Sequence, residues 1–143
     1  CALAMDKGRL ITLDRDPVMT EVAMKFWKMA NVDRIIELKL GNALDSLDEL
    51  LSSEENIGSF DMIFIDADKR NYQAYYELCL KLIANDGIIL FDNVLWSGDV
   101  ADPSNQEKDT VALRDLNQFL FNDNRVNISM IPVGDGITMV QKK

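Results

Sequence analysis

The fold of this chain is decided by residues 60–72, which read FDMIFIDADKRNY. The four consecutive apolar residues from Met62 to Ile65 predict a strand that is buried on both faces, as in a parallel sheet. This strand runs directly into Asp66, Asp68 and Lys69. Polar side chains at the carboxyl end of a buried strand are typical of ligand sites in open α/β sheets.

A second apolar run, residues 88–91, ends in the same way, because Asp92 and Asn93 follow it. If the two strands are parallel neighbours, Asp66, Asp92 and Asn93 meet at one edge of the sheet. Two carboxylates and an amide suit a hard divalent cation, with Mg²⁺ as the first choice and Mn²⁺ or Ca²⁺ as alternatives. The competing interpretation is that these acids only cap the loops after the strands.

Composition limits the possible functions. A length of 143 residues predicts a single domain, 1–143, and 48% hydrophobic residues are ordinary for a globular core. The formal charge of −9 argues against a nucleic-acid partner, whose phosphates would be repelled. The chain has no His, so metal binding and proton transfer must use Asp, Asn, Glu, Lys or Tyr.

The two cysteines, Cys1 and Cys79, do not suggest a disulfide framework, so we expect a reduced, cytoplasmic setting. No apolar run approaches the roughly 20 residues of a membrane span, and we expect no membrane partner. Residues 1–5 have the pattern of a helix end, and Asp6 begins a turn. A chain that opens in this way predicts a protein whose N-terminal part is missing here.

The order of the elements predicts an α/β fold. Strands and helices alternate along most of the chain, which is typical of a parallel sheet with helices on both faces. A long irregular run, residues 94–108, then suggests a functional loop or lid. The last two strands predict an antiparallel hairpin around a Gly134-Asp135-Gly136 turn. The expected strands are 10–13, 35–40, 62–65, 88–91, 126–132 and 137–141.

Local signals predict where the helices begin and end. Asp16 and Pro17 predict the start of the first helix, as its N-cap and first helical residue. The expected buried face of this helix comprises Val18, Val22, Phe26 and Met29. The other expected boundary signals are a Ser46/Glu49 capping box, Gly87 as a C-terminal cap and Asp109 as an N-cap.

Two side chains outside the metal set are candidates for chemistry. Asp14 ends the first expected strand, where an acid can bind the ribose hydroxyls of a nucleotide, although it can also be a simple turn residue. Lys69 lies three residues after Asp66. A Lys beside a cation can act as a general base, whereas the alternative is a surface Lys that pairs with Asp66 or Asp68.

Trp96 and Asp68 are candidates for substrate contacts. Trp96 lies in the long loop, where its ring can stack on a flat substrate or cover the site, or else anchor the loop in the core. Asp68 can be a further metal ligand, a helix cap or a residue that faces the substrate.

Together these segments resemble the cation-dependent, S-adenosylmethionine-dependent O-methyltransferases, the family of the caffeoyl-CoA and, more distantly, the catechol O-methyltransferases. The matching segments occur in the family's order and span nearly the whole chain. They are residues 8–14 (GRLITLD), 60–69 (FDMIFIDADK), 92–98 (DNVLWSG) and 132–137 (PVGDGI).

The resemblance implies a Rossmann-like class I methyltransferase sheet, mostly parallel, and a role for each matched residue. Asp14 would hold the ribose of S-adenosylmethionine, Ala43 would lie against its adenine, and Asp66 would also contribute to the cofactor site. Asp66, Asp92 and Asn93 would bind the cation. Lys69 would be the general base, and Trp96 falls in the variable substrate loop. A homodimer is expected from the resemblance alone.

The family's first strand and its Gly-rich cofactor loop are missing from this chain. The predicted reaction is methyl transfer to a hydroxyl of a catechol-like small molecule, that is, a hydroxylated aromatic ring with two vicinal hydroxyls. Three alternatives stay open at this point. They are a phospho-receiver signalling domain, a fragment of an NAD-dependent dehydrogenase, and an inactive truncated chain that acts only by dimerising.

Overall fold

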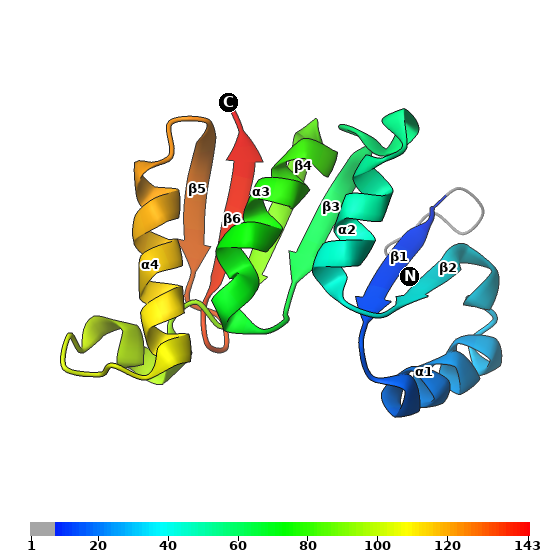
Figure 1. The fold of residues 1–143 in the computed structure, drawn as a ribbon, viewed down its shortest axis with the longest axis horizontal. Coiled ribbons are helices and arrows are strands. Elements are labelled where there is room, and N and C mark those ends of the chain that lie inside the picture. Colours follow the sequence, from blue (N-terminus) through cyan, green and yellow to red (C-terminus); the bar gives the residue numbers. More distant parts are fainter. Residues whose placement is uncertain (1–7) are drawn as a thin grey trace. The chain divides into compact units, whose positions relative to one another are not determined.

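A computed structural model describes residues 8–143, which form two compact units, residues 8–49 and 50–143 (Figure 1). Each unit is described by itself. The helix end expected at residues 1–5 and the turn expected from Asp6 lie outside the described residues. No helix within residues 8–143 combines the length and the apolar character that crossing a membrane requires.

The first unit contains a two-stranded parallel sheet. Strand β1 (Leu10–Asp14) pairs with β2 (Ile36–Leu40), and the helix α1 (Pro17–Met29) connects them together with a 3₁₀ turn. The predicted start of α1 is confirmed, because the Asp16 carboxylate accepts hydrogen bonds from the backbone N–H groups of Val18 and Met19. These bonds satisfy donors that the first helical turn leaves free.

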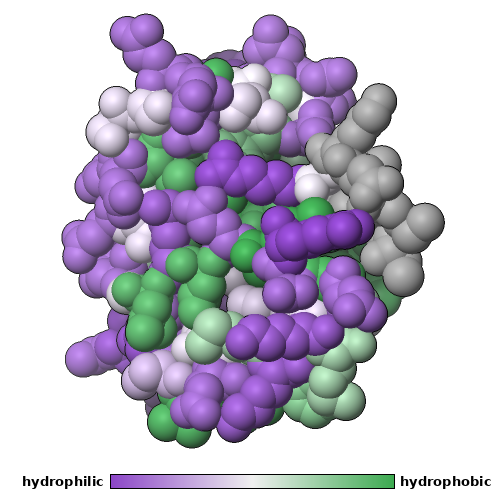
Figure 2. All heavy atoms as spheres, turned by 90° about the vertical axis from the view of Figure 1, so that its right-hand side faces the viewer, coloured by the Kyte–Doolittle hydropathy of each residue, from purple (hydrophilic) through white to green (hydrophobic). Residues whose placement is uncertain are grey.

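The prediction of a buried apolar face on α1 is wrong. Val18 is 68% exposed, Phe26 is 62% exposed and Met29 is 76% exposed. Val22 is also exposed. Figure 2 shows apolar side chains among polar ones at the surface. The physical reason is a lack of cover, since among the described residues α1 packs mainly against the 3₁₀ turn Asp33–Ile35.

The start of helix α2 (Ala43–Leu51) also differs from its prediction. The helix begins three residues before Ser46, so Ser46 lies inside it and the Ser46/Glu49 capping box does not form its start. Asn42 is the cap instead, because its side-chain oxygen accepts the N–H of Leu44 at 2.8 Å. Asn is as strong an N-cap as Ser, and it comes first along the chain.

The second unit contains a mixed four-stranded sheet in the order β3-β4-β6-β5. The first two strands, β3 (Phe60–Ile65) and β4 (Ile83–Asp92), are parallel. Strand β6 (Ile137–Lys142) runs antiparallel to β4 and to β5 (Val126–Ile131). The predicted C-terminal hairpin is therefore confirmed.

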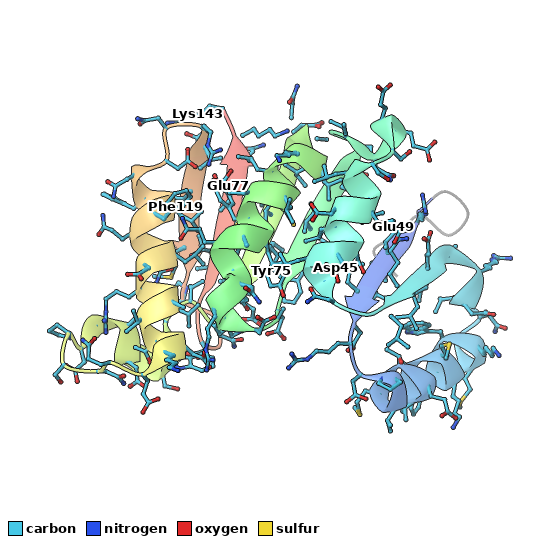
Figure 3. All side chains as sticks on the ribbon, in the orientation of Figure 1. Asp45, Glu49, Tyr75, Glu77, Phe119 and Lys143 are labelled. Atoms are coloured by element: carbon cyan, nitrogen blue, oxygen red, sulfur yellow. The ribbon has the colours of Figure 1, made fainter. Side chains whose placement is uncertain are left out.

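Helices α3 (Tyr72–Leu82) and α4 (Lys108–Asn122) lie side by side on one face of this sheet (Figure 1). Figure 3 labels Glu77 on α3 and Phe119 on α4, and the Phe119 ring packs edge-on against Tyr76. Each buried Leu or Phe in such a layer contributes about 2 kcal/mol. The fully buried side chains between helices and sheet include Tyr72, Tyr76, Ile89, Phe91, Leu113, Leu116, Leu120 and Val140.

The prediction that β3 is buried on both faces is wrong. Ile65 is buried, but Met62 is 59% exposed and Phe64 is 54% exposed. Strand β3 lies at the end of the four-strand order, and the helices α3 and α4 of its unit cover the other face of the sheet. A run of apolar residues cannot by itself tell a strand covered on both faces from one covered on a single face.

Two further boundary predictions are corrected. Helix α3 ends at Leu82, and Gly87 lies inside β4, where a Cβ atom would come within 2.8 Å of the Phe60 carbonyl oxygen. Gly87 thus permits close approach of two strands and does not cap a helix. Asp109 lies within α4, after the N-cap residue Glu107, and its carboxylate accepts a hydrogen bond from Arg70.

Candidate functional site

The parallel pair β3 and β4 delivers two carboxylates to one edge of the sheet. Ile65 and Phe91 are partners in the register of this pair. The residues that follow them, Asp66 and Asp92, are therefore neighbours at the ends of the two strands. Asn93 follows Asp92, and the Asp92 carboxylate accepts the Asn93 backbone N–H at 2.7 Å. This edge is the place where open α/β sheets bind ligands.

The amine of Lys69 lies at the centre of this group. Its Nζ atom donates hydrogen bonds to Asp66 Oδ1 at 3.2 Å, to Asn93 Oδ1 at 2.9 Å and to the Tyr72 hydroxyl at 2.5 Å. The side chain of Lys69 is only 7% exposed, because it lies in a 3₁₀ turn (Lys69–Asn71) between β3 and α3. Lys69 is therefore a held, nearly buried amine and not a free surface lysine.

The backbone after β4 adopts an uncommon conformation. Asn93, Trp96 and Ser97 have φ angles of 61°, 48° and 56°, which lie in the left-handed region. Each such residue costs of the order of 1 kcal/mol and persists only where its surroundings enforce it. Conformations of this kind cluster at functional sites.

Trp96 faces the Lys69 amine. The centroid of its indole lies 5.7 Å from Lys69 Nζ, within the range of a cation–π interaction. Trp96 begins a 3₁₀ segment (Trp96–Ala101) and is partly exposed. The ring can therefore contact both the amine and a bound molecule.

The Gly134-Asp135-Gly136 turn anchors this loop, a role that the sequence analysis missed. The Asp135 carboxylate accepts the Ser97 N–H at 2.6 Å, and the Asp135 carbonyl oxygen accepts the Leu95 N–H at 3.0 Å. In the sequence, two glycines around an acid predicted a turn but did not indicate which segment this turn contacts. The partner lies almost forty residues earlier in the chain and is set by the pairing of β4 with β6.

Gly136→Ala is expected to destabilise the second unit by about 3 kcal/mol. Gly136 has a φ of +83°, and an added Cβ would lie 2.6 Å from Leu95 Cγ. Gly134→Ala is the matched control, because Gly134 also has a positive φ but has no atom within 4 Å of an added Cβ. We expect it to cost about 1 kcal/mol. Urea unfolding measures the stability of both variants, and equal unfolding midpoints would contradict the role of close packing at Gly136.

A second anchor holds the far part of the loop. The Arg114 guanidinium on α4 donates to the carbonyl oxygens of Val100 at 3.1 Å, Asp102 at 2.7 Å and Asn105 at 3.1 Å. One rigid cation thus ties three points of the irregular segment to a helix. The loop predicted at residues 94–108 is therefore fixed to the second unit at both of its ends.

Asp68 is held within its own turn. Its carboxylate accepts hydrogen bonds from the Tyr75 hydroxyl at 2.6 Å and from the Asn71 amide at 2.5 Å. Tyr75 projects from α3, as Figure 3 shows. This geometry favours a role for Asp68 in shaping the turn that carries Lys69.

Tyr72 is a further residue of this site, and its place in the sequence did not indicate that role. Tyr72 is the first residue of α3, and its hydroxyl lies against Lys69. Burial raises the pKa of Tyr72, although the hydrogen bond from Lys69 opposes this effect. Cys79 has no such neighbour, and burial raises the pKa of its thiol to about 12, so it is a core residue and not a nucleophile.

The residues matched to the nucleotide site, Asp14 and Ala43, lie in the first unit. Asp14 ends β1, and its carboxylate accepts the Asp16 N–H at 2.9 Å. Ala43 is the first residue of α2, shortly after the end of β2. Because β1 and β2 are parallel and Asp14 pairs with Leu40, both residues lie at the carboxyl edge of the two-stranded sheet.

The oxygen atoms around Lys69 are compatible with a bound cation. Asp66 Oδ1 and Asn93 Oδ1 both lie within hydrogen-bond distance of one positively charged nitrogen, so this position already stabilises a cation. Among residues 8–143, no three Asp, Glu, Cys or His side chains gather as a ligand group. The candidate set therefore depends on the Asn93 amide beside two carboxylates, a combination that suits Mg²⁺ with water as further ligands.

Comparisons with known proteins identify the family and the fold of this chain. The profile of the O-methyltransferase family matches residues 1–143. "Probable caffeoyl-CoA O-methyltransferase 1" of Dictyostelium discoideum is 50% identical over 99% of this chain, and the caffeoyl-CoA O-methyltransferase of Medicago sativa is 39% identical over 99%. The crystal structure of the O-methyltransferase from Bacillus cereus with SAH superposes with a TM-score of 0.86, at 32% identity over 95% of this chain.

The chain spans 62% of the Dictyostelium relative, 60% of the Medicago relative and 63% of the Bacillus chain. Its α/β fold is the Rossmann-like fold of these methyltransferases, with an antiparallel C-terminal pair in the sheet. The family match covers every residue of the chain, so this protein belongs to the O-methyltransferase family.

Proposed function

We propose that the whole protein transfers a methyl group from S-adenosylmethionine to a hydroxyl of a catechol-like small molecule, with the help of a divalent cation. The observation that carries this proposal is the nearly buried Lys69 amine, held between the oxygens of Asp66 and Asn93 and facing Trp96. Membership of the O-methyltransferase family supports the reaction class and makes the phospho-receiver and dehydrogenase alternatives unnecessary.

Asp66, Asp92 and Asn93 are the proposed cation ligands. They lie at the ends of two neighbouring strands and offer only oxygen donors, which favours Mg²⁺ over softer metals, with Mn²⁺ and Ca²⁺ as alternatives. A divalent cation bound there supplies positive charge next to the substrate hydroxyls and so lowers their pKa.

Lys69 is the proposed general base. Its amine lies beside the ligand oxygens, where the neutral form could accept the proton of the substrate hydroxyl and become the ammonium. The oxygen then forms a bond to the methyl carbon while the carbon–sulfur bond of the sulfonium breaks. Much of the rate would come from holding the two reactants in contact.

The remaining site residues have binding roles in this proposal. Trp96 would stack on the ring of the substrate, and Asp68 would support the turn that carries Lys69 or contact the substrate at its edge. Asp14 would bind the cofactor ribose, Ala43 would lie near the adenine, and Asp66 would contribute to the cofactor site. The hydroxyl-rich aromatic substrate is suggested by the caffeoyl-CoA named for the Dictyostelium and Medicago relatives.

A homodimer and a cytoplasmic location stay predictions. A chain that acts only by dimerising also stays an alternative, because this chain spans less than two thirds of the length of these relatives. The activity proposed here is that of the whole protein.

Calorimetry with S-adenosylhomocysteine, combined with product analysis, tests the proposal. We expect the whole protein to bind S-adenosylhomocysteine and to convert caffeoyl-CoA into a product that is heavier by one methyl group when Mg²⁺ is present. EDTA should stop product formation, and added Mg²⁺ should restore it. Binding of NAD in preference to S-adenosylhomocysteine, or labelling of Asp66 by acetyl phosphate, would contradict the proposal.

A further inference from the structure

The hydroxyl of Tyr72 connects the Lys69 amine to both strands of the site. It lies 2.5 Å from Lys69 Nζ and 3.3 Å from the carbonyl oxygens of Ile65 and Asp92. These two carbonyls belong to the last residues of β3 and β4. A single buried oxygen atom therefore fixes the amine relative to the ends of both strands.

The Tyr72 ring is itself firmly placed. It has no exposed surface, and its centroid lies 5.7 Å from that of Phe91 in a tilted arrangement. Lys69 Nζ lies 4.6 Å from the Tyr72 ring centroid, so ring and hydroxyl both contact the lysine. The packing around the buried ring therefore fixes the position of the hydroxyl.

Tyr72 differs from the two other partners of Lys69 in one respect. Asp66 and Asn93 are proposed cation ligands, so a bound cation would engage the oxygens that now accept from Lys69. Tyr72 is not in the ligand set and keeps its hydroxyl for the amine. It is the partner that can hold Lys69 when the site is loaded.

We infer that Tyr72 is a positioning residue for Lys69, which keeps the amine at the site during methyl transfer. This inference rests on the proposed function. It assigns Tyr72 no contact with substrate or cofactor, and its effect on the reaction passes entirely through Lys69.

Tyr72→Phe in the whole protein tests the inference, because it removes one oxygen atom and keeps the ring. We expect kcat to fall about tenfold to a hundredfold, the range for a lost hydrogen bond to a charged group. The KM for caffeoyl-CoA and the affinity for S-adenosylhomocysteine should stay within about twofold. A merely structural role would change these binding constants too, and that result would overturn the inference.

Tyr76→Phe is the matched control. Tyr76 is also fully buried in α3, and its ring also packs on Phe91, at 6.2 Å between centroids. Its hydroxyl donates to Asp123 instead, at 2.8 Å. We expect Tyr76→Phe to leave kcat unchanged, so an equal loss of kcat in both variants would overturn the inference.

The Lys69→Met/Tyr72→Phe double variant decides whether the effect passes through Lys69. If it does, Tyr72→Phe lowers kcat no further in the Lys69→Met background. If the loss of kcat in the double variant instead equals the product of the losses in the two single variants, the inference is overturned and the proposed function still stands. If Lys69→Met alone leaves kcat unchanged, the proposed function of Lys69 fails, and the inference fails with it.

Discussion

Asp92→Asn in the whole protein is expected to lower metal-dependent methyl transfer about 1000-fold, which corresponds to about 4 kcal/mol in the barrier. The substitution removes one of two carboxylate charges from the proposed ligand set. Asn keeps an oxygen that can still accept the Asn93 N–H, so the strained turn after β4 should stay intact. The loss would then report on the cation and not on the backbone.

The measurement combines initial rates with direct binding of the metal. We expect the Mg²⁺ concentration for half-maximal rate to rise at least about 100-fold, and Mn²⁺ binding seen by electron paramagnetic resonance to weaken in parallel. Asp86→Asn is the control, because Asp86 is an exposed residue of the same strand outside the proposed ligand set. Full turnover in EDTA, or an unchanged Mg²⁺ requirement in Asp92→Asn, would show that these residues do not bind the cation.

Lys69→Arg is expected to lower kcat about 1000-fold while the affinity for S-adenosylhomocysteine stays unchanged. An Arg carries a positive charge, and its guanidinium stays protonated, so it cannot take a proton from a hydroxyl near neutral pH. The site is also tight, since the Lys69 side chain is only 7% exposed and contacts three oxygens. The larger guanidinium would have to displace at least one of them.

Comparison with Lys69→Met separates two possible roles of the amine. If Lys69 acts as a base, Arg and Met are both expected to abolish most of the turnover. If Lys69 supplies only positive charge, Arg should keep more than about a third of kcat and Met should lose it, which would refute the base. Lys81→Arg, on the exposed side of α3, controls for the change of residue type.

The sequence predicted those features that depend on neighbours along the chain. Asp16 and Pro17 mark the start of α1 because a cap acts on backbone groups two and three residues away. The C-terminal hairpin followed from two short strands around a glycine-rich turn. The position of Asp66 and Asp92 at the strand ends followed from where each apolar run stops.

Predictions about burial failed where the partner of a surface mattered. The apolar stripe of α1 and the Met62/Phe64 side of β3 have the spacing of buried faces, yet both are exposed. Periodicity says which residues share a face, but only packing partners decide whether that face is covered. The prediction that Gly87 caps a helix failed for a related reason, since its small size permits the close approach of Phe60 on the neighbouring strand.

The sequence by itself determined the α/β order, the family resemblance and the candidate residues Asp66, Lys69, Asp92 and Asn93. Each of these depends on a pattern of residues that are close together along the chain. Only the tertiary structure revealed that Tyr72 holds Lys69 and that Asp135 anchors the loop of Trp96. Those contacts join separate elements through the register of β3, β4 and β6. Their geometry depends on packing that no short stretch of sequence contains.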